Sequence, residues 1–439
     1  MTDTIFALAS APGRAGIAVM RVSGPLAGST LRALTGERLP PERRAALRKL
    51  RDEGGVALDE ALALWFAGPR SFTGEDSIEL HLHGGGAVIA AVSARLAELG
   101  LRPAEPGEFT RRAFENEKLD LTEAEGLADL IDAETEGQRA QALAQMSGAL
   151  RRLYEQWRDR LIDILAAIEG EIDFPDEGDV PDALASTAGS GLAALIAELA
   201  EHLDDDRRGE RVREGFTIAL IGEPNAGKSS LLNALTQRDA AIVTEIPGTT
   251  RDVVEVRQVR SGFPIILADT AGLRRAVDQV EAEGVRRALA RAETADLRLG
   301  VVDVSRETLR AVEPHLKTGD ALVFNKCDLG TLNDVNWPNY FFVSTKTGDG
   351  LAELSDWIDQ QVLKRLSVRE TPALSRARHR HAVETAHDAL VRAQAHLSGQ
   401  AELAGAEAHI AARALASLTG GVDVEDVLDR VFSQFCIGK

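Results

Sequence analysis

Cysteine is scarce in this chain of 439 residues: it has two, Cys327 and Cys436, far apart in the sequence. Their spacing excludes a disulfide-rich scaffold and a cysteine zinc site. No run of about 18 apolar residues occurs, and the first residues lack the positive charge that opens a secretory signal. We therefore expect a soluble cytoplasmic protein.

Aromatic residues and positive charge are also in short supply. The chain has 13 Phe, 4 Trp and 2 Tyr, and its 50 basic residues are outnumbered by 69 acidic ones, which gives a net charge of −19. A protein that follows a nucleic-acid backbone over a long surface normally shows a basic stripe and stacking aromatics. Any contact with nucleic acid is therefore expected to be local or made through a partner.

The chain is long enough for several domains, because single cores rarely grow beyond about 250–300 residues. Residues 1–118 alternate short strand-like runs, at 17–22 and 78–83, with helical patches, which indicates a small α+β domain. Residues 119–213 and 369–439 are rich in Ala and Leu, as in a helical domain. Residues 214–368 predict a doubly wound α/β domain inserted into the helical one. Its strands are expected at 216–221, 253–259, 264–268, 297–304, 321–324 and 340–343.

The helical segments carry three local signals. Thr122, with Glu125 three residues later, has the pattern of a capping box and predicts a helix start. Apolar residues at three-and-four spacing within 150–168 predict one buried face of a long helix. The apolar stripe within 424–432 is expected to pack on the helices of residues 120–210, because a short helix cannot bury such a stripe alone.

A phosphate-binding loop follows the strand expected at 216–221. Residues 222–229 read GEPNAGKS, which matches G-x-x-x-x-G-K-[ST]. The glycines let the loop turn tightly and aim its N–H groups at phosphate oxygens, at the positive end of the next helix. Lys228 would contact the β- and γ-phosphates, and the Ser229 hydroxyl would bind Mg²⁺.

Three further elements follow in the order that a guanine-nucleotide site requires. Residues 269–272 (DTAG) end an apolar strand, where Asp269 can hold the shell around Mg²⁺. Residues 325–328 (NKCD) place the carboxylate of Asp328 against the N1 and N2 donors that guanine has and adenine lacks. Residues 344–346 (STK) would back the base.

The loop at 244–252 (TEIPGTTRD) is predicted to be a nucleotide-dependent switch, because its threonines can reach Mg²⁺ and the γ-phosphate. Leu273 stands where Ras-type enzymes carry the glutamine that orients water, so hydrolysis needs another residue, for which Glu281 is a candidate. The predicted GTP-binding residues are Asn225, Ala226, Gly227, Lys228, Ser229, Ser230, Thr244, Thr249, Thr250, Asp269, Thr270, Ala271, Gly272, Asn325, Lys326, Asp328, Ser344, Thr345 and Lys346.

The sequence resembles the MnmE (TrmE) family of tRNA-modification GTPases along essentially its whole length. Besides the motifs above, the matching stretches are PGRAGI at 12–17, FTGED at 72–76, PGEFT at 106–110, NEKLDL at 116–121 and FCIGK at 435–439. These outer stretches distinguish the chain from other GTPases with the same nucleotide motifs.

The resemblance implies a potassium-stimulated GTPase whose nucleotide domains form a transient dimer, with K⁺ in place of an arginine finger. The residues that match K⁺ ligands are Asn225, Thr244, Ile246 and Thr249, and those that match Mg²⁺ ligands are Ser229 and Thr250, with Asp269 in the surrounding shell. Glu281 matches the acid that orients water. The predicted catalytic residues are thus Glu281, Lys228 and Thr250.

The resemblance also implies a homodimer formed through the N-terminal domain, which binds 5-formyltetrahydrofolate or a related folate. The matching residues are Arg21, Glu79, Lys118 and Lys439, and we interpret Cys436 as facing this site and assisting one-carbon chemistry. A flavin-dependent partner, MnmG (GidA), is implied in adding an aminomethyl or carboxymethylaminomethyl group to the wobble uridine of tRNA. The tRNA would be contacted mainly through that partner.

A GTP-dependent switch in ribosome assembly is the alternative. Such a switch would need a basic RNA-binding appendage such as a KH domain, and none is visible in the sequence. Arg21, Lys118 and the terminal cysteine favour tRNA modification instead. A non-enzymatic folate-binding scaffold fails to explain a complete nucleotide site.

Overall fold

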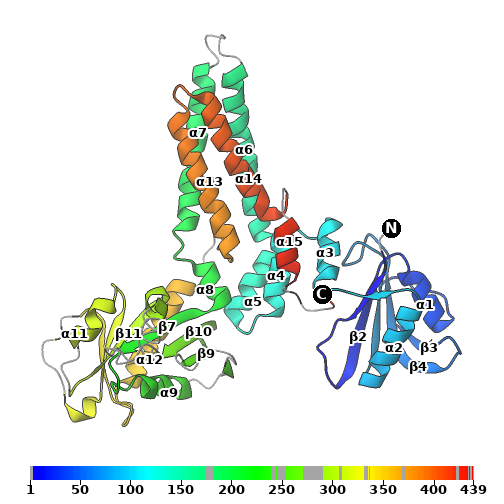
Figure 1. Ribbon diagram of the computed structural model, residues 1–439, viewed down its shortest axis with the longest axis horizontal. Helices are drawn as coiled ribbons and strands as arrows, with labels where there is room; N and C mark the ends of the chain where they lie inside the picture. Colours follow the sequence, from blue (N-terminus) through cyan, green and yellow to red (C-terminus); the bar gives the residue numbers. More distant parts are fainter. Residues whose placement is uncertain are drawn as a thin grey trace, which may run out of the picture. The chain divides into compact units, whose positions relative to one another are not determined.

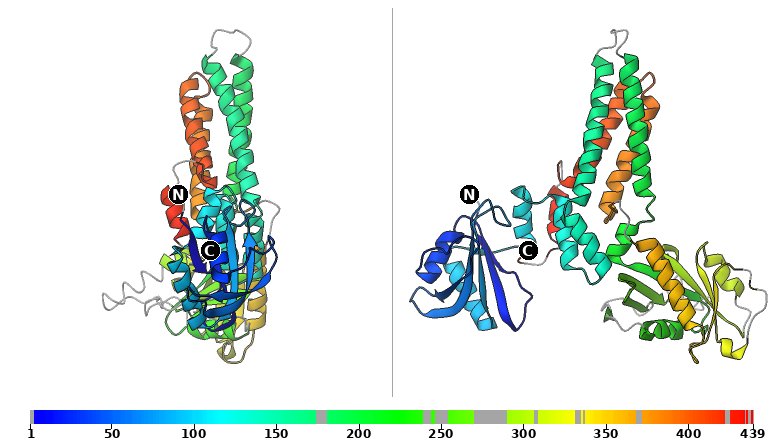
Figure 2. Two further views of the ribbon diagram at one scale, coloured as in Figure 1. Left: turned by 90° about the vertical axis from the view of Figure 1, so that its right-hand side faces the viewer. Right: turned by 180° about the vertical axis from the view of Figure 1, so that it is seen from behind.

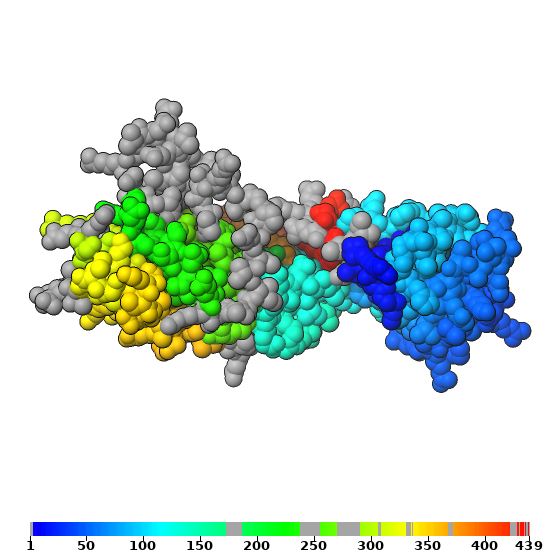
Figure 3. All heavy atoms as spheres, turned by 90° about the horizontal axis from the view of Figure 1, so that it is seen from below, coloured from blue at the N-terminus to red at the C-terminus, as the bar shows by residue number. Residues whose placement is uncertain are grey.

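The computed structural model describes residues 3–173, 181–238, 244–245, 254–269, 290–305, 309–330, 335, 337–367, 372–421, 425–433, 435 and 438, which are coloured in Figure 1 and Figure 3. By their contacts, the residues form two units. The first comprises Met1–Ala128, Gln145–Ala166 and Gly405–Lys439, and the second Asp129–Ala144 and Ala167–Ala404. None of the described helices combines the length and the apolar character that crossing a bilayer requires.

Six strands among the described residues of the first unit form a sheet in the order β3-β4-β5-β2-β1-β6. They are β1 (Ile5–Leu8), β2 (Ala15–Ser23), β3 (Ala46–Arg51), β4 (Ala57–Phe66), β5 (Ser77–Gly84) and β6 (Arg102–Pro103), and the accompanying helices are α1 (Ala27–Thr35) and α2 (Gly86–Glu98). Met20 and Leu80 of the sheet share one core with Leu31 of α1 and Leu96 of α2. The strands expected at 17–22 and 78–83 are confirmed as parts of β2 and β5.

The helices that follow in the first unit are α3 (Glu108–Glu115), α4 (Leu121–Ile131) and α15 (Glu425–Phe432). The capping box at the start of α4 was predicted in the wrong register. Asp120 Oδ1 accepts from the Glu123 N–H at 2.7 Å, and Glu123 Oε2 accepts from the Asp120 N–H at 2.9 Å. Thr122 lies inside the first turn, where its hydroxyl donates to Asp120.

The C-terminal apolar stripe packs on α4, as its composition predicted. Phe432 and Phe435 form one cluster with Leu121 and Ala124, and Phe114 of α3 packs against it. The ring centroids of Phe114 and Phe432 are 6.3 Å apart. Phe432 and Phe435 are thereby packed against residues of α3 and α4.

A group of charged side chains ties α3 to the loops of the N-terminal sheet. Arg112, which is only 6% exposed, lies 2.8 Å from Asp3, 3.1 Å from Glu75 and 2.9 Å from Glu108. Arg102 donates two hydrogen bonds to the same Glu108 carboxylate, at 2.8 and 2.6 Å. Burial alone would raise the pKa of Glu108, but the bonds from Arg102, the Glu105 backbone N–H and Arg112 outweigh it and lower the pKa below its usual value.

Long helices make up much of the rest of the chain: α5 (Glu136–Met146), α6 (Ala149–Asp173), α7 (Pro181–Leu203), α8 (Arg208–Glu214), α12 (Leu351–Leu366), α13 (Ala377–His396) and α14 (Ala401–Thr419). The predicted apolar face of α6 is buried at Leu150, Leu153, Trp157, Leu161, Ile164 and Ile168. In the second unit, α7 and α13 run side by side (Figure 1, Figure 2), although the strands of a whole sheet lie between them in the chain.

That sheet has seven strands among the described residues, in the order β13-β12-β11-β7-β10-β9-β8. They are β7 (Phe216–Gly222), β8 (Thr244–Glu245), β9 (Val254–Arg260), β10 (Phe263–Asp269), β11 (Leu297–Asp303), β12 (Ala321–Asn325) and β13 (Tyr340–Val343). All six strands expected from the sequence are confirmed, with bounds within one residue of those predicted. β8 and β9 pair antiparallel, and the other pairs except β9–β10 are parallel.

The hairpin of β9 and β10 turns against the start of α5. The Gly137 N–H donates to the carbonyl oxygen of Gly262 at the tip of the hairpin, at 2.8 Å. A Cβ on Gly137 would stand 2.5 Å from the ring of Phe263, so a side chain has no room there. Thr135 and Gln138 cap the helix with reciprocal hydrogen bonds, and Gln138 also donates to the carbonyl of Arg213 in α8.

Candidate functional site

The described parts of four predicted nucleotide motifs, at 222–229, 269–272, 325–328 and 344–346, lie at one edge of the seven-stranded sheet. β7, β10, β11, β12 and β13 are parallel, so their carboxyl ends meet at that edge. Each motif begins where one of these strands ends. This edge is where doubly wound sheets bind their ligands.

The phosphate-binding loop joins β7 to α9 (Lys228–Arg238). Asn225 and Gly227 both adopt left-handed backbone conformations, with φ of 65° and 95°. A Cβ at Gly227 would lie 2.0 Å from Nδ2 of Asn325. Glycine is therefore required here, both for its positive φ and because a side chain has no room. The Lys228 ammonium lies 3.1 Å from the carbonyl oxygens of Gly222 and Glu223, which hold it within the loop.

Lys228 is 7% exposed, and burial lowers its pKa, while the carboxylate of Asp269 opposes that change. The Ser229 hydroxyl donates to Asp269 Oδ2 at 2.5 Å, so α9 and the end of β10 bring together the two oxygens that the sequence assigned to Mg²⁺. Oxygen donors are the ligands that Mg²⁺ prefers, and it usually takes one or two from the protein and the rest from phosphate and water. Among the residues described, no group of three or more His, Cys, Asp or Glu side chains that could hold a metal occurs.

Residues 325–328 hold the phosphate-binding loop from the other side. Asn325, which is fully buried, donates to the carbonyl of Ala226 at 3.0 Å, and Lys326 donates to the carbonyl of Asn225 at 3.0 Å. The Asn325 side-chain oxygen also accepts from the Lys326 N–H at 2.8 Å and the Thr345 N–H at 3.3 Å. One buried amide therefore joins three of the predicted motifs.

The carboxylate of Asp328 is exposed and could accept hydrogen bonds from a guanine base. Its Oδ1 accepts from the Ser344 hydroxyl at 2.7 Å, which orients the exposed carboxylate. The structure thus brings together Asp328, Ser344 and Thr345 as predicted, whereas the exposed side chain of Lys346 has no hydrogen bond recorded to the described residues. Ser230 follows Ser229 in the first turn of α9 and is exposed.

Several predicted site residues lie outside the described part of the chain: Ile246, Thr249, Thr250, Thr270, Ala271, Gly272, Glu281, Cys436 and Lys439. Thr244 is described only as backbone, in β8. Their assignments stay predictions.

Asp303, which the sequence analysis did not assign, is joined to the predicted site by its contact with Lys326. It ends β11, its side chain is 3% exposed, and its Oδ2 lies 2.6 Å from Nζ of Lys326. Its Oδ1 accepts from both the N–H and the hydroxyl of Ser305, at 3.0 and 2.7 Å. Burial would raise the pKa of Asp303, but the bonds from Lys326 and Ser305 lower it below its usual value. The available signal was an acidic residue within an apolar strand.

The first unit brings together three of the residues matched to folate binding. Arg21 donates from Nε and Nη2 to Glu79 at 3.1 and 2.9 Å, and its guanidinium lies 5.5 Å from the ring centroid of Phe72 and 5.8 Å from that of Phe109. Lys118 packs beside Gly74, in the same loop as Phe72. The two rings, which the sequence analysis did not assign, are within the range of cation–π contact with the guanidinium.

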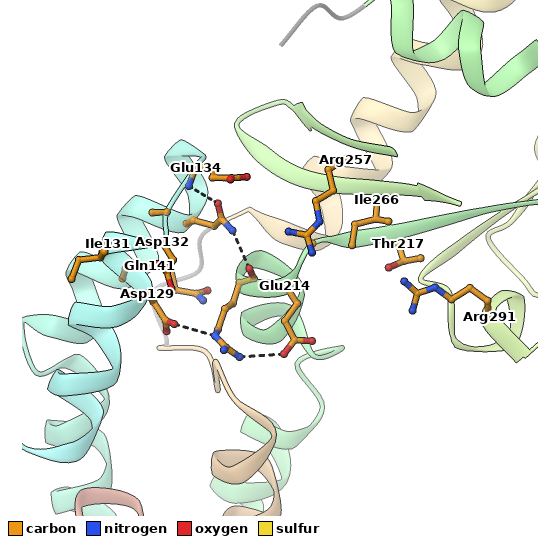
Figure 4. Close-up of a pocket in the computed structure, with 15 residues that line it drawn as sticks. Asp129, Ile131, Asp132, Glu134, Gln141, Glu214, Thr217, Arg257, Ile266 and Arg291 are labelled. Atoms are coloured by element: carbon orange, nitrogen blue, oxygen red, sulfur yellow. Dashed lines mark hydrogen bonds and ion pairs between the residues drawn. The ribbon is translucent and has the colours of Figure 1, made fainter. Parts of the chain in front are cut away.

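An open cleft of about 870 Å³ occurs at the opposite edge of the seven-stranded sheet (Figure 4). Its lining comes from residues 129–142, the end of α8 and strands β7, β9 and β10. Arg213 is one of the lining residues and donates hydrogen bonds to Asp129 at 3.0 Å and Glu214 at 3.2 Å. Because Thr217 lies near the start of β7, this cleft is separate from the nucleotide edge.

Two family models match the chain. A model described as GTP-binding protein TrmE N-terminus matches residues 4–118, and one described as MnmE helical domain matches residues 121–436. Among solved structures, the G domain of the FeoB iron transporter of T. maritima is 28% identical over 33% of this chain and 97% of that chain, with a TM-score of 0.27, which is too low to support an argument.

Curated relatives match from end to end. The tRNA modification GTPase MnmE of Maricaulis maris is 64% identical, and that of Parvibaculum lavamentivorans is 54% identical, each over 100% of both chains. With identity this high across every segment, and with both family models in place, the chain belongs to the MnmE (TrmE) family of tRNA modification GTPases.

Proposed function

We propose that this protein is a potassium-activated GTPase that hydrolyses GTP to GDP and phosphate. With MnmG (GidA), it would drive addition of an aminomethyl or carboxymethylaminomethyl group at C5 of the wobble uridine of certain tRNAs. The observation that carries the proposal is the buried amide of Asn325, which joins the phosphate-binding loop, the NKCD segment and the STK segment into one site. The relatives' name, tRNA modification GTPase, supports the same activity.

The chain's own residues supply binding and charge stabilisation. The loop amides and Lys228 hold the phosphates, and Asp328 selects guanine by accepting from its N1 and N2 donors. Ser229 and Thr250 would hold Mg²⁺, with Asp269 in its shell, and the bound ion offsets charge on the phosphate oxygens. Burial removes the Lys228 ammonium from water and lowers its pKa. A negatively charged phosphate beside the ammonium would stabilise its charged form.

Potassium would bind at Asn225, Thr244, Ile246 and Thr249 and supply positive charge where an arginine finger would otherwise act. The exposed side chain of Asn225, presented by a left-handed loop residue, supports this assignment. Glu281 would orient the attacking water, since Leu273 replaces the usual glutamine.

The N-terminal part of the first unit would bind 5-formyltetrahydrofolate or a related folate through Arg21, Glu79, Lys118 and Lys439. A planar guanidinium is suited to a carboxylate, because it donates two parallel hydrogen bonds. Gly438, the neighbour of Lys439, lies against Leu8, whose strand pairs with that of Arg21. That contact of Gly438 supports the proposal that Lys439 contributes to this site and that Cys436 assists one-carbon chemistry there.

The partners proposed are a second copy of the chain, MnmG and tRNA, with tRNA contacted mainly through MnmG. Homodimerisation through the N-terminal sheet is supported by its uncovered face. Leu47 and Leu62 are directly opposite each other on β3 and β4 and are 59% and 43% exposed, whereas Ala61 and Ala63, on the other face, are buried. Neighbouring exposed leucines favour burial against another protein surface.

The GTPase rate in KCl and in NaCl at equal ionic strength, for wild type and Glu281→Ala, tests the proposed activity. We expect a large K⁺-specific stimulation that the variant loses. Equal wild-type rates in both salts would contradict the cation-assisted mechanism and favour a GTP-dependent switch with an externally supplied catalytic group. The affinity for guanine nucleotide, measured in both salts, shows separately whether the site binds nucleotide.

A further inference from the structure

Asp303 is buried at the carboxyl end of β11, one strand away from the phosphate-binding loop in the sheet order. Its two carboxylate oxygens have different partners. Oδ1 is fixed by the N–H and hydroxyl of Ser305, and Oδ2 faces the ammonium of Lys326 at 2.6 Å. The carboxylate is thus held in one orientation, and its contact restricts the side-chain conformations of Lys326.

Lys326 connects Asp303 to the phosphate-binding loop. The same ammonium donates to the backbone carbonyl of Asn225 at 3.0 Å, so Asp303, Lys326 and Asn225 form one chain of polar contacts. Asn225 is the residue of the loop with a φ of 65°, a conformation that asparagine tolerates at some cost and that surrounding contacts must maintain. The Lys326 bond is one of those contacts.

Charge gives Asp303 a second role. The Lys326 ammonium lies close to the residue proposed to bind K⁺, and an uncompensated positive charge there would repel a second cation. Asp303 carries the compensating negative charge at the shortest distance recorded for Lys326. Removing that charge would leave the lysine free to move and its repulsion unopposed.

We propose that Asp303 is a positioning residue for the potassium site, which acts through Lys326 to fix the Asn225 segment of the loop and to cancel the lysine's charge. This inference rests on the proposed potassium activation and goes beyond it by naming what sets the affinity of the site for K⁺. In this proposal Asp303 acts through Lys326 and is not a ligand of K⁺ or of the nucleotide.

A matched control exists at the other edge of the same sheet. Asp320 is buried to the same extent, with 3% of its side chain exposed, and pairs with a cation, Arg298, at 3.4 Å. It precedes β12, whereas Asp303 pairs with the last residue of that strand, Asn325. Asp320→Asn therefore removes an equivalent buried charge away from the nucleotide edge.

The test measures GTPase rate at saturating GTP against KCl concentration, with ionic strength kept constant by NaCl, in full-length wild type, Asp303→Asn and Asp320→Asn. We expect Asp303→Asn to raise the KCl concentration for half-maximal stimulation about tenfold, within the usual range of coupling between two sites. Asp320→Asn should leave that concentration as in wild type. Asp303→Glu, which restores the charge, should recover part of the loss and carries the test if Asp303→Asn does not fold.

A readout other than activity separates positioning from a general structural effect. In the presence of GDP and aluminium fluoride, K⁺ that binds the folded protein raises its melting temperature, and the KCl concentration for half of that rise reports affinity. We expect Asp303→Asn to shift this concentration as it shifts the kinetic one. A lower melting temperature with an unchanged KCl midpoint would overturn the inference. A wild type insensitive to K⁺ would instead overturn the proposed potassium activation, and this inference with it.

Discussion

Replacing Asn325 with alanine is expected to disconnect the nucleotide motifs from one another. The substitution removes one hydrogen bond given to Ala226 and two accepted from the backbone of Lys326 and Thr345. Asn325 is fully buried, so water cannot replace these bonds without entering the core of the site.

The expected loss follows from those three bonds. Each contributes about 1 kcal/mol net, so together they contribute about 3 kcal/mol. If the loss falls on the nucleotide-bound state, the affinity for GDP falls about a hundredfold, because 1.4 kcal/mol corresponds to a factor of ten. Asn325→Asp keeps the accepting oxygens but places a second oxygen against the Ala226 carbonyl, so it should bind GDP at least as weakly as the alanine variant.

Titration with a fluorescent GDP analogue measures the change, and thermal unfolding shows how much of the 3 kcal/mol appears as lost stability instead. Asn339→Ala is the control, since its amide donates to the Asp320 carbonyl at 3.3 Å, near the start of the strands. A GDP dissociation constant for Asn325→Ala within about threefold of wild type, with an unchanged melting temperature, would refute the reasoning.

Other substitutions test contacts elsewhere. Gly137→Ala should lower the free energy of unfolding by about 1–3 kcal/mol, because its Cβ would overlap Phe263. Thermal unfolding measures this, and Gly86→Ala, with no atom within 4 Å of the new Cβ, should cause no loss; equal melting temperatures for the two variants would contradict the crowding. The pKa of Glu108 is lowered on folding, so its stabilisation is complete above pH 4.5 and is lost as pH falls through the lowered pKa. Urea unfolding of wild type and Glu108→Gln should therefore show a stability difference at pH 7 that shrinks towards pH 3, and a constant difference would count against the carboxylate's role. Arg21→Ala should weaken binding of 5-formyltetrahydrofolate about tenfold or more by calorimetry, and Arg21→Lys should recover little of it, because lysine cannot donate two parallel bonds; unchanged affinity in both would remove Arg21 from the site.

The strands of the seven-stranded sheet could be predicted closely because local sequence dictates them. β7, β10 and β12 are short apolar runs that end at a predicted motif, as β7 ends at the glycine-rich loop. The N-terminal sheet was less predictable. β3 lies at an edge and carries Arg48 and Lys49, so its alternation of apolar and polar residues is weak.

The parts that could not be predicted depend on contacts between distant residues. At the start of α4, periodicity alone does not show that Asp120, rather than Thr122, precedes the first turn. The acidic residue at the end of an apolar strand singles out Asp303, but it does not reveal the partner, because Lys326 lies 23 positions further along the chain. The clamp of Phe72 and Phe109 around Arg21 likewise depends on three separate segments.

The pairing of α7 with α13 affects how the protein is made. Leu192, Leu195 and Leu199 of α7 are fully buried, yet about 170 residues separate the end of α7 from the start of α13. At translation rates of about 5–20 residues per second, α7 waits roughly 9–35 s for its partner, long enough for the intervening sheet to fold first. During synthesis, we expect the leucine face of α7 to lack its α13 neighbour until that helix has been made, and slower translation of the sheet segment should lengthen this period.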